Sequence, residues 1–288
     1  MEFVSELTAA TLVARLRAAG CVYAEAEAEI LLEAAPGARE LDAMVQRRVQ
    51  GLPLEHVVGW AAFRGLRIKV ATGVFVPRLR TEFLVVQAAR ILRRLQRTTG
   101  DGSNAVALDL CCGSGAIAAA LGAEFPGLEI HAADIDQAAV ECAAENLAHL
   151  SGAAYCGDLF APLPPDLCGR IGIVTANAPY VPTHDIAFMP QEARFFEPDA
   201  ALNGGDDGLD IQRRIAADAP QWLSPGGHLI METSPSQAAE SVRILERNGF
   251  RASSVHSEVL DGTAVVGLFS GGDQKIISSE ATMPRKTE

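Results

Sequence analysis

The sequence lacks the features that mark membrane-spanning, secreted and metal-binding proteins. No uncharged apolar run approaches the roughly 18 residues of a membrane span, and the acidic opening Met1-Glu2-Phe3 does not predict a signal peptide. The six cysteines form no Cys-x-x-Cys pair and no His/Cys spacing of the kind that binds a metal. We therefore expect reduced thiols in a cytoplasmic protein, with no membrane association and no metal site.

Positive charge is scarce as well. The chain has 24 Lys and Arg residues against 36 Asp and Glu residues, which gives a formal net charge of −12. Because nucleic-acid-binding domains usually show a basic footprint, this balance argues against a nucleic-acid partner. The length of 288 residues, of which 49% are hydrophobic, is sufficient for a substantial buried core.

The periodicity of apolar residues divides the chain into regions. Residues 1–60 have helical patterns and predict a small helical domain. Residues 61–80 contain Phe63-Arg64-Gly65-Leu66-Arg67-Ile68, whose alternation predicts a strand or hairpin and a linker. Residues 81–270 form the largest region, and the polar residues 271–288, which lack periodicity, predict a disordered tail.

Strand and helix patterns alternate in the region 81–270. Alternation of this kind predicts an α/β fold with a doubly wound, mainly parallel sheet, closed by an antiparallel pair of strands. The expected strands lie near residues 105–110, 128–133, 153–156, 171–176, 228–231, 252–256 and 264–269.

Asn177-Ala178-Pro179-Tyr180 directly follows the apolar run 171–176. Open α/β sheets bind their ligands at the carboxyl ends of the strands, where this polar tetrapeptide would lie. Taken alone, Asn and Pro also suit an ordinary turn. The neighbouring motifs favour a ligand site instead.

The loop Asp109-Leu110-Cys111-Cys112-Gly113-Ser114-Gly115 joins a predicted strand to a helix. Its glycines let the backbone approach a ligand, and Asp134 ends the next strand, where a carboxylate binds ribose in nucleotide sites. The third glycine of the dinucleotide fingerprint is missing. Asp109 before the glycines would repel a phosphate and suits the cation S-adenosylmethionine (SAM), which we therefore favour over a dinucleotide.

Asp158 and Leu159 follow the third strand of this region. The carboxylate could accept the adenine amino group, and Leu159 could line the base, although an ordinary loop is the alternative. The predicted cofactor-binding residues are Asp109, Cys111, Gly113, Gly115, Asp134, Ile135, Asp158, Leu159 and Asn177.

These motifs, in this order, resemble class I SAM-dependent methyltransferases. Further segments resemble the glutamine-N5 methyltransferases of peptide chain release factors, over about residues 5 to 269. They are residues 53–59, 63–66, 76–78, 81–82, 197–198, 201–202, 204–205, 207–210 and 223–227. The resemblance implies a helical amino-terminal domain for substrate recognition, and a seven-stranded sheet with the last strand antiparallel.

The sequence departs from the family pattern in two places, as in a divergent subgroup. Ala178 stands where the family's Asn-Pro-Pro-Tyr has its first proline. Leu79 and Arg80 replace the proline and glutamate of the family's Pro-Arg-Pro-Glu-Thr-Glu, so that a base stands in place of an acid.

We expect the tetrapeptide to carry out the chemistry. Asn177 and the Ala178 carbonyl would accept the two N–H groups of a planar nitrogen, Pro179 would set the chain direction, and Tyr180 would pack on the substrate. Arg78, Arg80 and Glu82 are the further candidates for substrate binding, although Glu82 could equally cap its helix.

Several substrates fit this pattern. The leading prediction is the side-chain amide of a protein glutamine, in a release factor the glutamine of its Gly-Gly-Gln loop. The second is a small molecule with a planar nitrogen, such as the guanidine of free arginine. The third is adenine N6 in nucleic acid, which the net charge disfavours. A SAM-binding module without activity is a fourth possibility.

Overall fold

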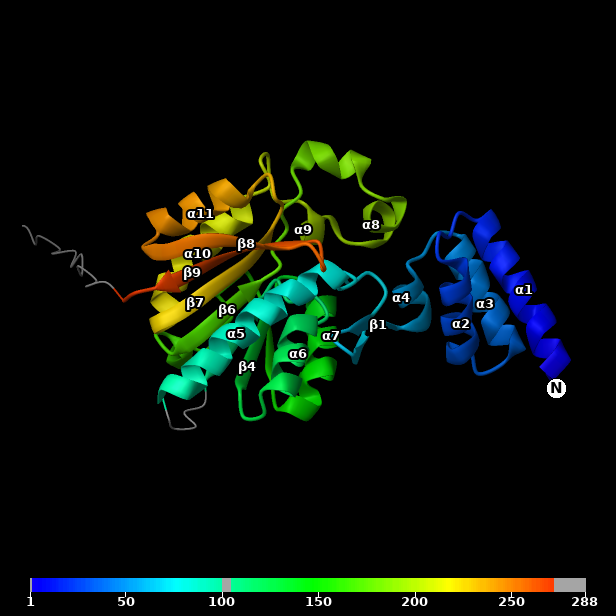
Figure 1. Ribbon diagram of the computed structural model, residues 1–288, viewed down its shortest axis with the longest axis horizontal. Coiled ribbons are helices and arrows are strands. Elements are labelled where there is room, and N and C mark those ends of the chain that lie inside the picture. Colours follow the sequence, from blue (N-terminus) through cyan, green and yellow to red (C-terminus); the bar gives the residue numbers. More distant parts are fainter. Residues whose placement is uncertain (1, 100–104, 272–288) are drawn as a thin grey trace, which may run out of the picture.

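A computed structural model of the chain describes residues 2–99 and 105–271. Four helices at the amino-terminal end form a layer of their own at one end of the long axis (Figure 1). The predicted tail, residues 271–288, lies outside the described residues except for Gly271.

The amino-terminal helices are α1 (Glu2–Ala18), α2 (Ala24–Ala34), α3 (Ala38–Val49) and α4 (Leu54–Val58). The helix-breaking residues Gly20, Pro36 and Pro53 lie between them. Their buried faces meet in a separate apolar cluster, which consists of Leu12, Leu16, Cys21, Ala24, Ala28, Leu31, Val45 and Val57. The predicted helical region therefore has its own core.

A hairpin and a linker connect these helices to the rest of the chain. Strands β1 (Trp60–Phe63) and β2 (Leu66–Lys69) pair antiparallel around the turn Arg64-Gly65, as the alternating pattern predicted. The linker leads through the short 3-10 helix η1 (Leu79–Thr81) into the helix α5 (Glu82–Thr99).

The remaining strands form one seven-stranded sheet with the order β5-β4-β3-β6-β7-β9-β8. They are β3 (Val106–Leu110), β4 (Glu129–Asp134), β5 (Ala153–Cys156), β6 (Ile171–Ala176), β7 (Leu223–Thr233), β8 (Phe250–Ser257) and β9 (Gly262–Phe269). Only β9 runs against its neighbours in this sheet. The predicted fold, with an antiparallel last strand, is confirmed.

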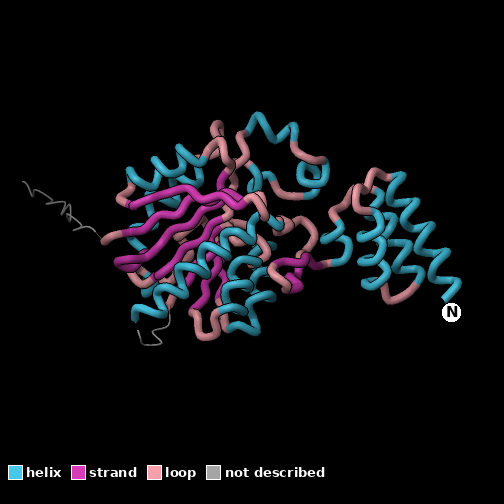
Figure 2. Tube along the Cα trace, viewed as in Figure 1, coloured by secondary structure: helices cyan, strands magenta, loops and turns pink. Residues whose placement is uncertain are grey.

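Successive side chains of the central strands enter different cores. Leu108 and Leu110 of β3 belong to the cluster that includes α10 and α11, whereas Ala107 between them belongs to the cluster with α5 and α6. The sheet is therefore covered on both faces, and Figure 2 shows α5 and α6 crossing one of them. The covering helices are α5, α6 (Ala116–Glu124), α7 (Gln137–Leu147), α10 (Asp210–Trp222) and α11 (Ala238–Arg247).

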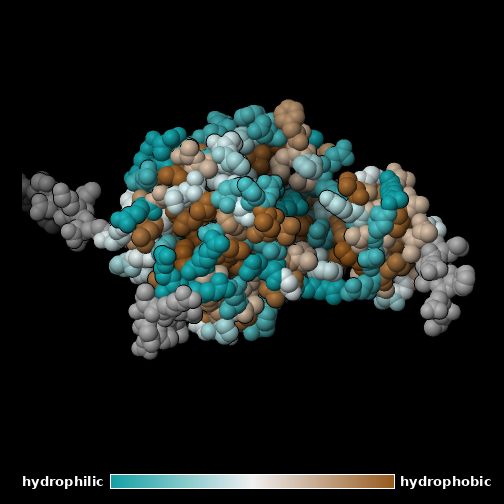
Figure 3. Space-filling view, viewed as in Figure 1, coloured by the Kyte–Doolittle hydropathy of each residue, from teal (hydrophilic) through white to brown (hydrophobic). Residues whose placement is uncertain are grey.

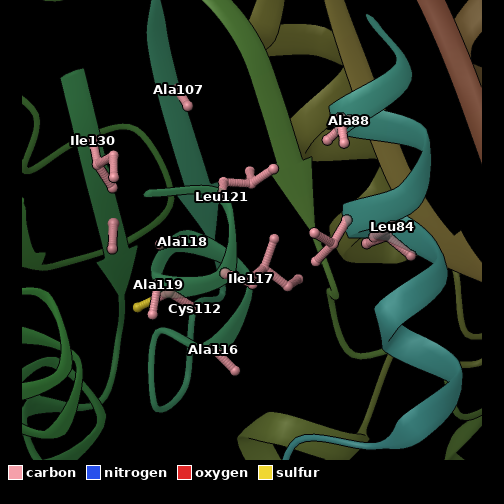
Figure 4. Close-up of a cluster of buried hydrophobic side chains, with 14 of the residues drawn as sticks. Leu84, Ala88, Ala107, Cys112, Ala116, Ile117, Ala118, Ala119, Leu121 and Ile130 are labelled. Atoms are coloured by element: carbon pink, nitrogen blue, oxygen red, sulfur yellow. The ribbon is translucent and has the colours of Figure 1, made fainter. Parts of the chain in front are cut away.

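Helix α6 is apolar almost all round because it lies between the sheet and other helices. Its Ile117 and Leu121 lie between Ile130 of β4 and Leu84 of α5 (Figure 4). All four side chains are at most 5% exposed. This burial holds the glycine loop that precedes α6 against the end of the sheet.

Residues 183–202, here called the covering segment, contain the 3-10 helix η4 (Thr183–Phe188) and the short helices α8 (Gln191–Phe196) and α9 (Asp199–Leu202). The sequence did not predict these elements, because none is long enough to show a periodic apolar stripe. Further 3-10 turns are η2 (Ala148–Leu150) and η3 (Pro165–Leu167). Arg48 of α3 pairs with Glu192 of α8 at 2.8 Å, so the covering segment contacts the helical domain.

The surface carries no sign of a membrane span in the part of the chain that the structure describes. None of the helices there is both long and apolar enough to cross a bilayer. The face seen in Figure 3 mixes hydrophilic and hydrophobic side chains.

Gly115 provides a test of how α6 and α7 pack. It has φ of +73°, and a Cβ there would lie 3.0 Å from the Cβ of Ala143 in α7. We expect Gly115→Ala to lower the free energy of unfolding by about 2 kcal/mol, through backbone strain and the forced contact. The measurement is urea denaturation.

Gly127→Ala is the matched control, because Gly127 also has a positive φ of +90° but no atom within 4 Å of an added Cβ. We expect Gly127→Ala to lower the free energy of unfolding by about 1 kcal/mol, through backbone strain alone. Equal losses in the two variants would contradict the packing explanation.

Candidate functional site

A cavity of about 240 Å³ opens at the carboxyl ends of the parallel strands. The strand order reverses between β3 and β6, which is where ligands bind in open α/β sheets. Residues that follow β3, β4, β5 and β6 line the cavity, together with residues of the linker, the covering segment and α10. The lining consists of Val74, Phe75, Cys111, Gly113, Ala133, Asp134, Ile135, Asp136, Ala139, Asp158, Leu159, Asn177, Pro179, Pro198, Ala200, Ala201, Asn203, Ile211 and Arg214.

The glycine loop is held to the neighbouring strand by Asp134. The Gly113 amide donates to Asp134 Oδ2 at 2.8 Å, and the Asp136 amide donates to Oδ1 at 3.0 Å. Both carboxylate oxygens thus have fixed directions while the side chain lines the cavity. Burial raises the pKa of Asp134 above its ordinary value, and the amide hydrogen bonds oppose that rise. A carboxylate in this position can accept the hydroxyl groups of a ribose.

Two lining residues other than glycine adopt the left-handed backbone region. Cys111 has φ of +53° and Leu159 has φ of +49°. Conformations of this kind cost energy and concentrate at ligand sites. They bring two strand-end loops close to the cavity from opposite sides of β4.

Asp158 is paired with a residue that the sequence did not suggest. Arg214 of α10 donates to Asp158 Oδ2 at 2.5 Å, and both side chains line the cavity and are about half exposed. The ion pair leaves the other carboxylate oxygen of Asp158 free of this arginine. It could accept an amino group such as that of adenine.

The charge of the lining favours a cationic ligand. Asp134, Asp136 and Asp158 face the cavity with Arg214 as the one cation among the lining residues. This excess of negative charge suits a sulfonium and an α-amino group and would repel a pyrophosphate. The residues therefore fit SAM better than a dinucleotide.

Asn177 and Pro179 of the tetrapeptide line the same cavity. Asn177 Nδ2 donates to the hydroxyl of Thr81 at 3.4 Å, and Thr81 is 3% exposed. With Nδ2 turned towards Thr81, the carbonyl oxygen Oδ1 is the end of the amide that can accept an N–H. Thr81 was not predicted to act at the site, because its contact with Asn177 joins residues that are 96 positions apart.

Asp109 and Gly115, both predicted to bind the cofactor, do not line the cavity. The Asp109 carboxylate, 2% exposed, accepts from Thr175 Oγ1 at 3.0 Å and from the Ala118 amide at 3.3 Å. Burial raises its pKa to about 8. Because the carboxylate faces Thr175 and α6, it makes no direct contact with the cavity. Gly115 instead allows α6 to approach α7.

The other predicted substrate residues also lie outside the lining. Ala178 is 1% exposed and packs in the apolar cluster beside α10. Arg78 pairs with the buried Glu197 of the covering segment. Tyr180 and Arg80 both contact Glu232. Glu82 accepts from the Arg64 amide of the hairpin at 2.8 Å, so it anchors the β1–β2 turn as α5 begins.

Phe75, Arg214 and the residues of the covering segment that line the cavity were missed at the sequence level. Phe75 directly precedes a segment that resembles the family, and Pro198 and Ala201 lie within two others, but only the folded arrangement brings these residues to the cavity. Glu232 was also missed. Its one signal is that it follows the apolar residues Leu229-Ile230-Met231, as Asp134 follows the apolar residues of its own strand.

Comparison with known proteins identifies the family. Residues 84–188 match the model of the methyltransferase small domain. The release factor glutamine methyltransferase of Thermodesulfovibrio yellowstonii is 34% identical over 77% of this chain and 78% of its own length. That of Deinococcus radiodurans is 34% identical over 88% of this chain and 93% of its own length. That of Streptomyces coelicolor is 35% identical over 75% of each.

The chain belongs to the release factor glutamine methyltransferase family. It is a SAM-dependent methyltransferase, and the cavity between the glycine loop, Asp134 and Asn177 has the residues to hold SAM. As the resemblance predicted, the chain combines a helical amino-terminal region with the seven-stranded sheet.

Asp134→Asn is expected to weaken SAM binding at least tenfold. Both oxygens of Asp134 accept from backbone amides, so an asparagine must turn its own NH₂ towards Gly113 or Asp136. A tenfold loss corresponds to about 1.4 kcal/mol. Titration calorimetry with SAM measures the dissociation constant.

Asp136→Asn is the control, because asparagine can still accept from the Ala138 amide and cap α7. We expect its SAM affinity to stay within about threefold of wild type, which is under 0.7 kcal/mol. A larger loss in this variant than in Asp134→Asn would reverse the assignment of the ribose ligand.

Asp109 makes the stability of the enzyme depend on pH. Its pKa of about 8 in the folded state lies above the ordinary value of 3.8. The folded state therefore binds a proton that the unfolded state releases, and stability falls as pH rises from about 4 to about 8.

The free energy of unfolding should fall less between pH 5 and pH 8 in Asp109→Asn than in the wild type. The difference should be at least about 1 kcal/mol, since one pKa unit is worth about 1.4 kcal/mol. Urea denaturation at both pH values measures it. A loss of the same size in both proteins would exclude Asp109 as its source.

Proposed function

We propose that this enzyme methylates the N5 side-chain amide of a protein glutamine, and that its substrate is the glutamine of the Gly-Gly-Gln loop of a peptide chain release factor. The observation that carries the proposal is Asn177. Its amide lines the SAM cavity and has its NH₂ directed to Thr81. The names of the relatives support the choice of substrate.

An amide nitrogen is a weak nucleophile because its lone pair is delocalised into the carbonyl group. Positioning can supply a large part of the missing reactivity, up to about 7–11 kcal/mol. Asn177 Oδ1 would accept one N–H of the substrate amide, which orients the amide plane beside the methyl donor. Bound SAM supplies the methyl group as a sulfonium.

The surroundings suit a nitrogen that becomes positive as its bond to the methyl group forms. Asn177 is uncharged and presents the negative end of its dipole, and the lining carries more aspartates than arginines. Fixed acceptors and negative charge stabilise the developing cation without reorganising. The product loses its extra proton readily, so the site needs no strong base.

We further propose that the helical domain and the covering segment position the protein substrate. Arg48 is 8% exposed and joins Glu27 of α2 to Glu192 of the covering segment. At the other end of α8, Glu197 accepts from the Val76 amide and from Arg78 of the linker. These pairs, each with one buried partner, join the helical domain, the linker and the covering segment beside the cavity.

Methylation of free arginine is the second candidate, because a guanidinium is also planar. Arg80 and Arg214 are each paired with an acid, Glu232 and Asp158, so these charges do not separate a guanidinium from an amide. The names of the relatives favour the amide. Adenine N6 is disfavoured by the net charge of −12.

The deciding experiment is transfer of label from SAM to release factor, to free arginine and glutamine, and to RNA in parallel. Label in release factor that is lost when its Gly-Gly-Gln glutamine is replaced by alanine would establish the proposal. Label in free arginine alone, or in RNA alone, would overturn it.

Asn177→Ala should lower turnover of the protein substrate at saturating SAM by at least about 100-fold, because it removes an acceptor aimed at the reacting nitrogen. Thr81→Val should lower it less, about tenfold, since Asn177 keeps its oxygen but loses its anchor. Steady-state kinetics measures both.

Thr81→Ser is the matched control, because it retains the hydroxyl group that Asn177 contacts. Turnover close to wild type is expected there. An Asn177→Ala enzyme with wild-type turnover would remove the basis of the mechanism.

A further inference from the structure

Glu232 lies next to Asn177 at the carboxyl end of the sheet. Strands β6 and β7 are parallel, and Ala176 pairs with Met231 in their register. Asn177 directly follows β6, and Glu232 follows Met231 within β7, so the two residues are neighbours across the sheet. The end of β7 is fixed because Gln212 of α10 donates to the Glu232 carbonyl at 3.1 Å.

The Glu232 side chain is a buried carboxylate at the edge of the catalytic tetrapeptide. The residue is 1% exposed, and its Oε1 accepts from the Tyr180 hydroxyl and from Arg80 Nε, each at 3.1 Å. Its Oε2 is buried without a hydrogen-bond partner among residues 2–99 and 105–271. A buried, incompletely paired carboxylate costs stability. Its presence is therefore better explained by the site than by the fold.

The two residues that Glu232 contacts are neighbours of the catalytic groups. Tyr180 ends the tetrapeptide, and its carbonyl accepts from Gln237 Nε2 at 2.9 Å, so main chain and hydroxyl are both anchored. Arg80 directly precedes Thr81, which contacts Asn177. Both ends of the tetrapeptide are thus tied to η1, Asn177 through Thr81 and Tyr180 through Glu232 and Arg80.

We propose that Glu232 is a positioning residue for methyl transfer, which holds Tyr180 and Arg80 so that the tetrapeptide keeps the geometry needed to grip the substrate amide. The proposal rests on the function proposed above. Glu232, Tyr180 and Arg80 do not line the SAM cavity. Loss of the carboxylate should therefore affect turnover and leave SAM binding intact.

The first test separates turnover from SAM binding. Glu232→Gln removes the charge but keeps the size of the side chain, and we expect kcat for the protein substrate to fall 10- to 100-fold with the dissociation constant for SAM within twofold of wild type. Glu240→Gln, on the outer face of α11 where Glu240 pairs with Arg243 and Arg247, is the matched control and should leave both unchanged.

The second test probes the hydrogen bond between Tyr180 and Glu232 directly and needs no substrate. Burial and the Glu232 carboxylate raise the pKa of Tyr180 to about 12. Its titration can be followed by ¹⁹F NMR after 3-fluorotyrosine replaces the three tyrosines, since the fluorine brings the phenol pKa to milder pH. We expect Glu232→Gln to lower the pKa of residue 180, with Tyr180→Phe assigning the resonance.

Tyr180→Phe is also a control for misfolding of Glu232→Gln, because it removes the same hydrogen bond and leaves Glu232 paired with Arg80. It should reproduce the loss of kcat, and the double variant should lose little more than either single variant. Multiplicative losses, an unchanged kcat in Glu232→Gln, or an unchanged pKa of residue 180 would each overturn the proposal.

Failure of the proposed function gives a different result. A wild-type enzyme that labels free arginine instead of release factor removes that function, while the titration still decides the pairing. The same kcat comparison on arginine then decides the positioning role.

Discussion

The site depends on one topological constraint, the reversal of strand order between β3 and β6. The helices that follow β3 and β6 leave to opposite faces of the sheet, so the space above their carboxyl ends stays open. Loops from four parallel strands converge there, and Asp134 ties the first of them in place through Gly113. Asn177 lines this space, where we propose that SAM and the substrate amide meet.

The two departures from the family pattern have different consequences. Ala178 is buried in the apolar cluster beside α10, so the exchange of proline for alanine changes packing and leaves the lining of the cavity unaltered. Arg80 is half exposed and paired with Glu232 next to Tyr180. Of the two departures, only Arg80 therefore presents a charged, half-exposed side chain beside the tetrapeptide.

Several acidic groups are buried around the site at a cost in stability. Asp109, Glu197 and Glu232 are each at most 6% exposed, and burial raises the pKa of Asp109 and Glu197. Each holds a separate piece in place, namely the start of α6, the linker with the covering segment, and the tetrapeptide with η1. The stability cost of burying an acid therefore falls on residues that fix the segments around the candidate site.

Local pattern determined the α/β class, the seven strands, the antiparallel last strand and the order of the motifs, because strand alternation, strand-ending acids and glycine turns act over a few residues. It also placed Cys111, Gly113, Asp134, Asp158 and Asn177 in one site. Tertiary structure alone decided that Asp109 faces Thr175 instead of the cavity, that Glu82 anchors a hairpin, and that Thr81, Arg214 and Glu232 complete the site. These contacts join residues that are 18 to 152 positions apart in the chain, beyond the reach of any local periodicity.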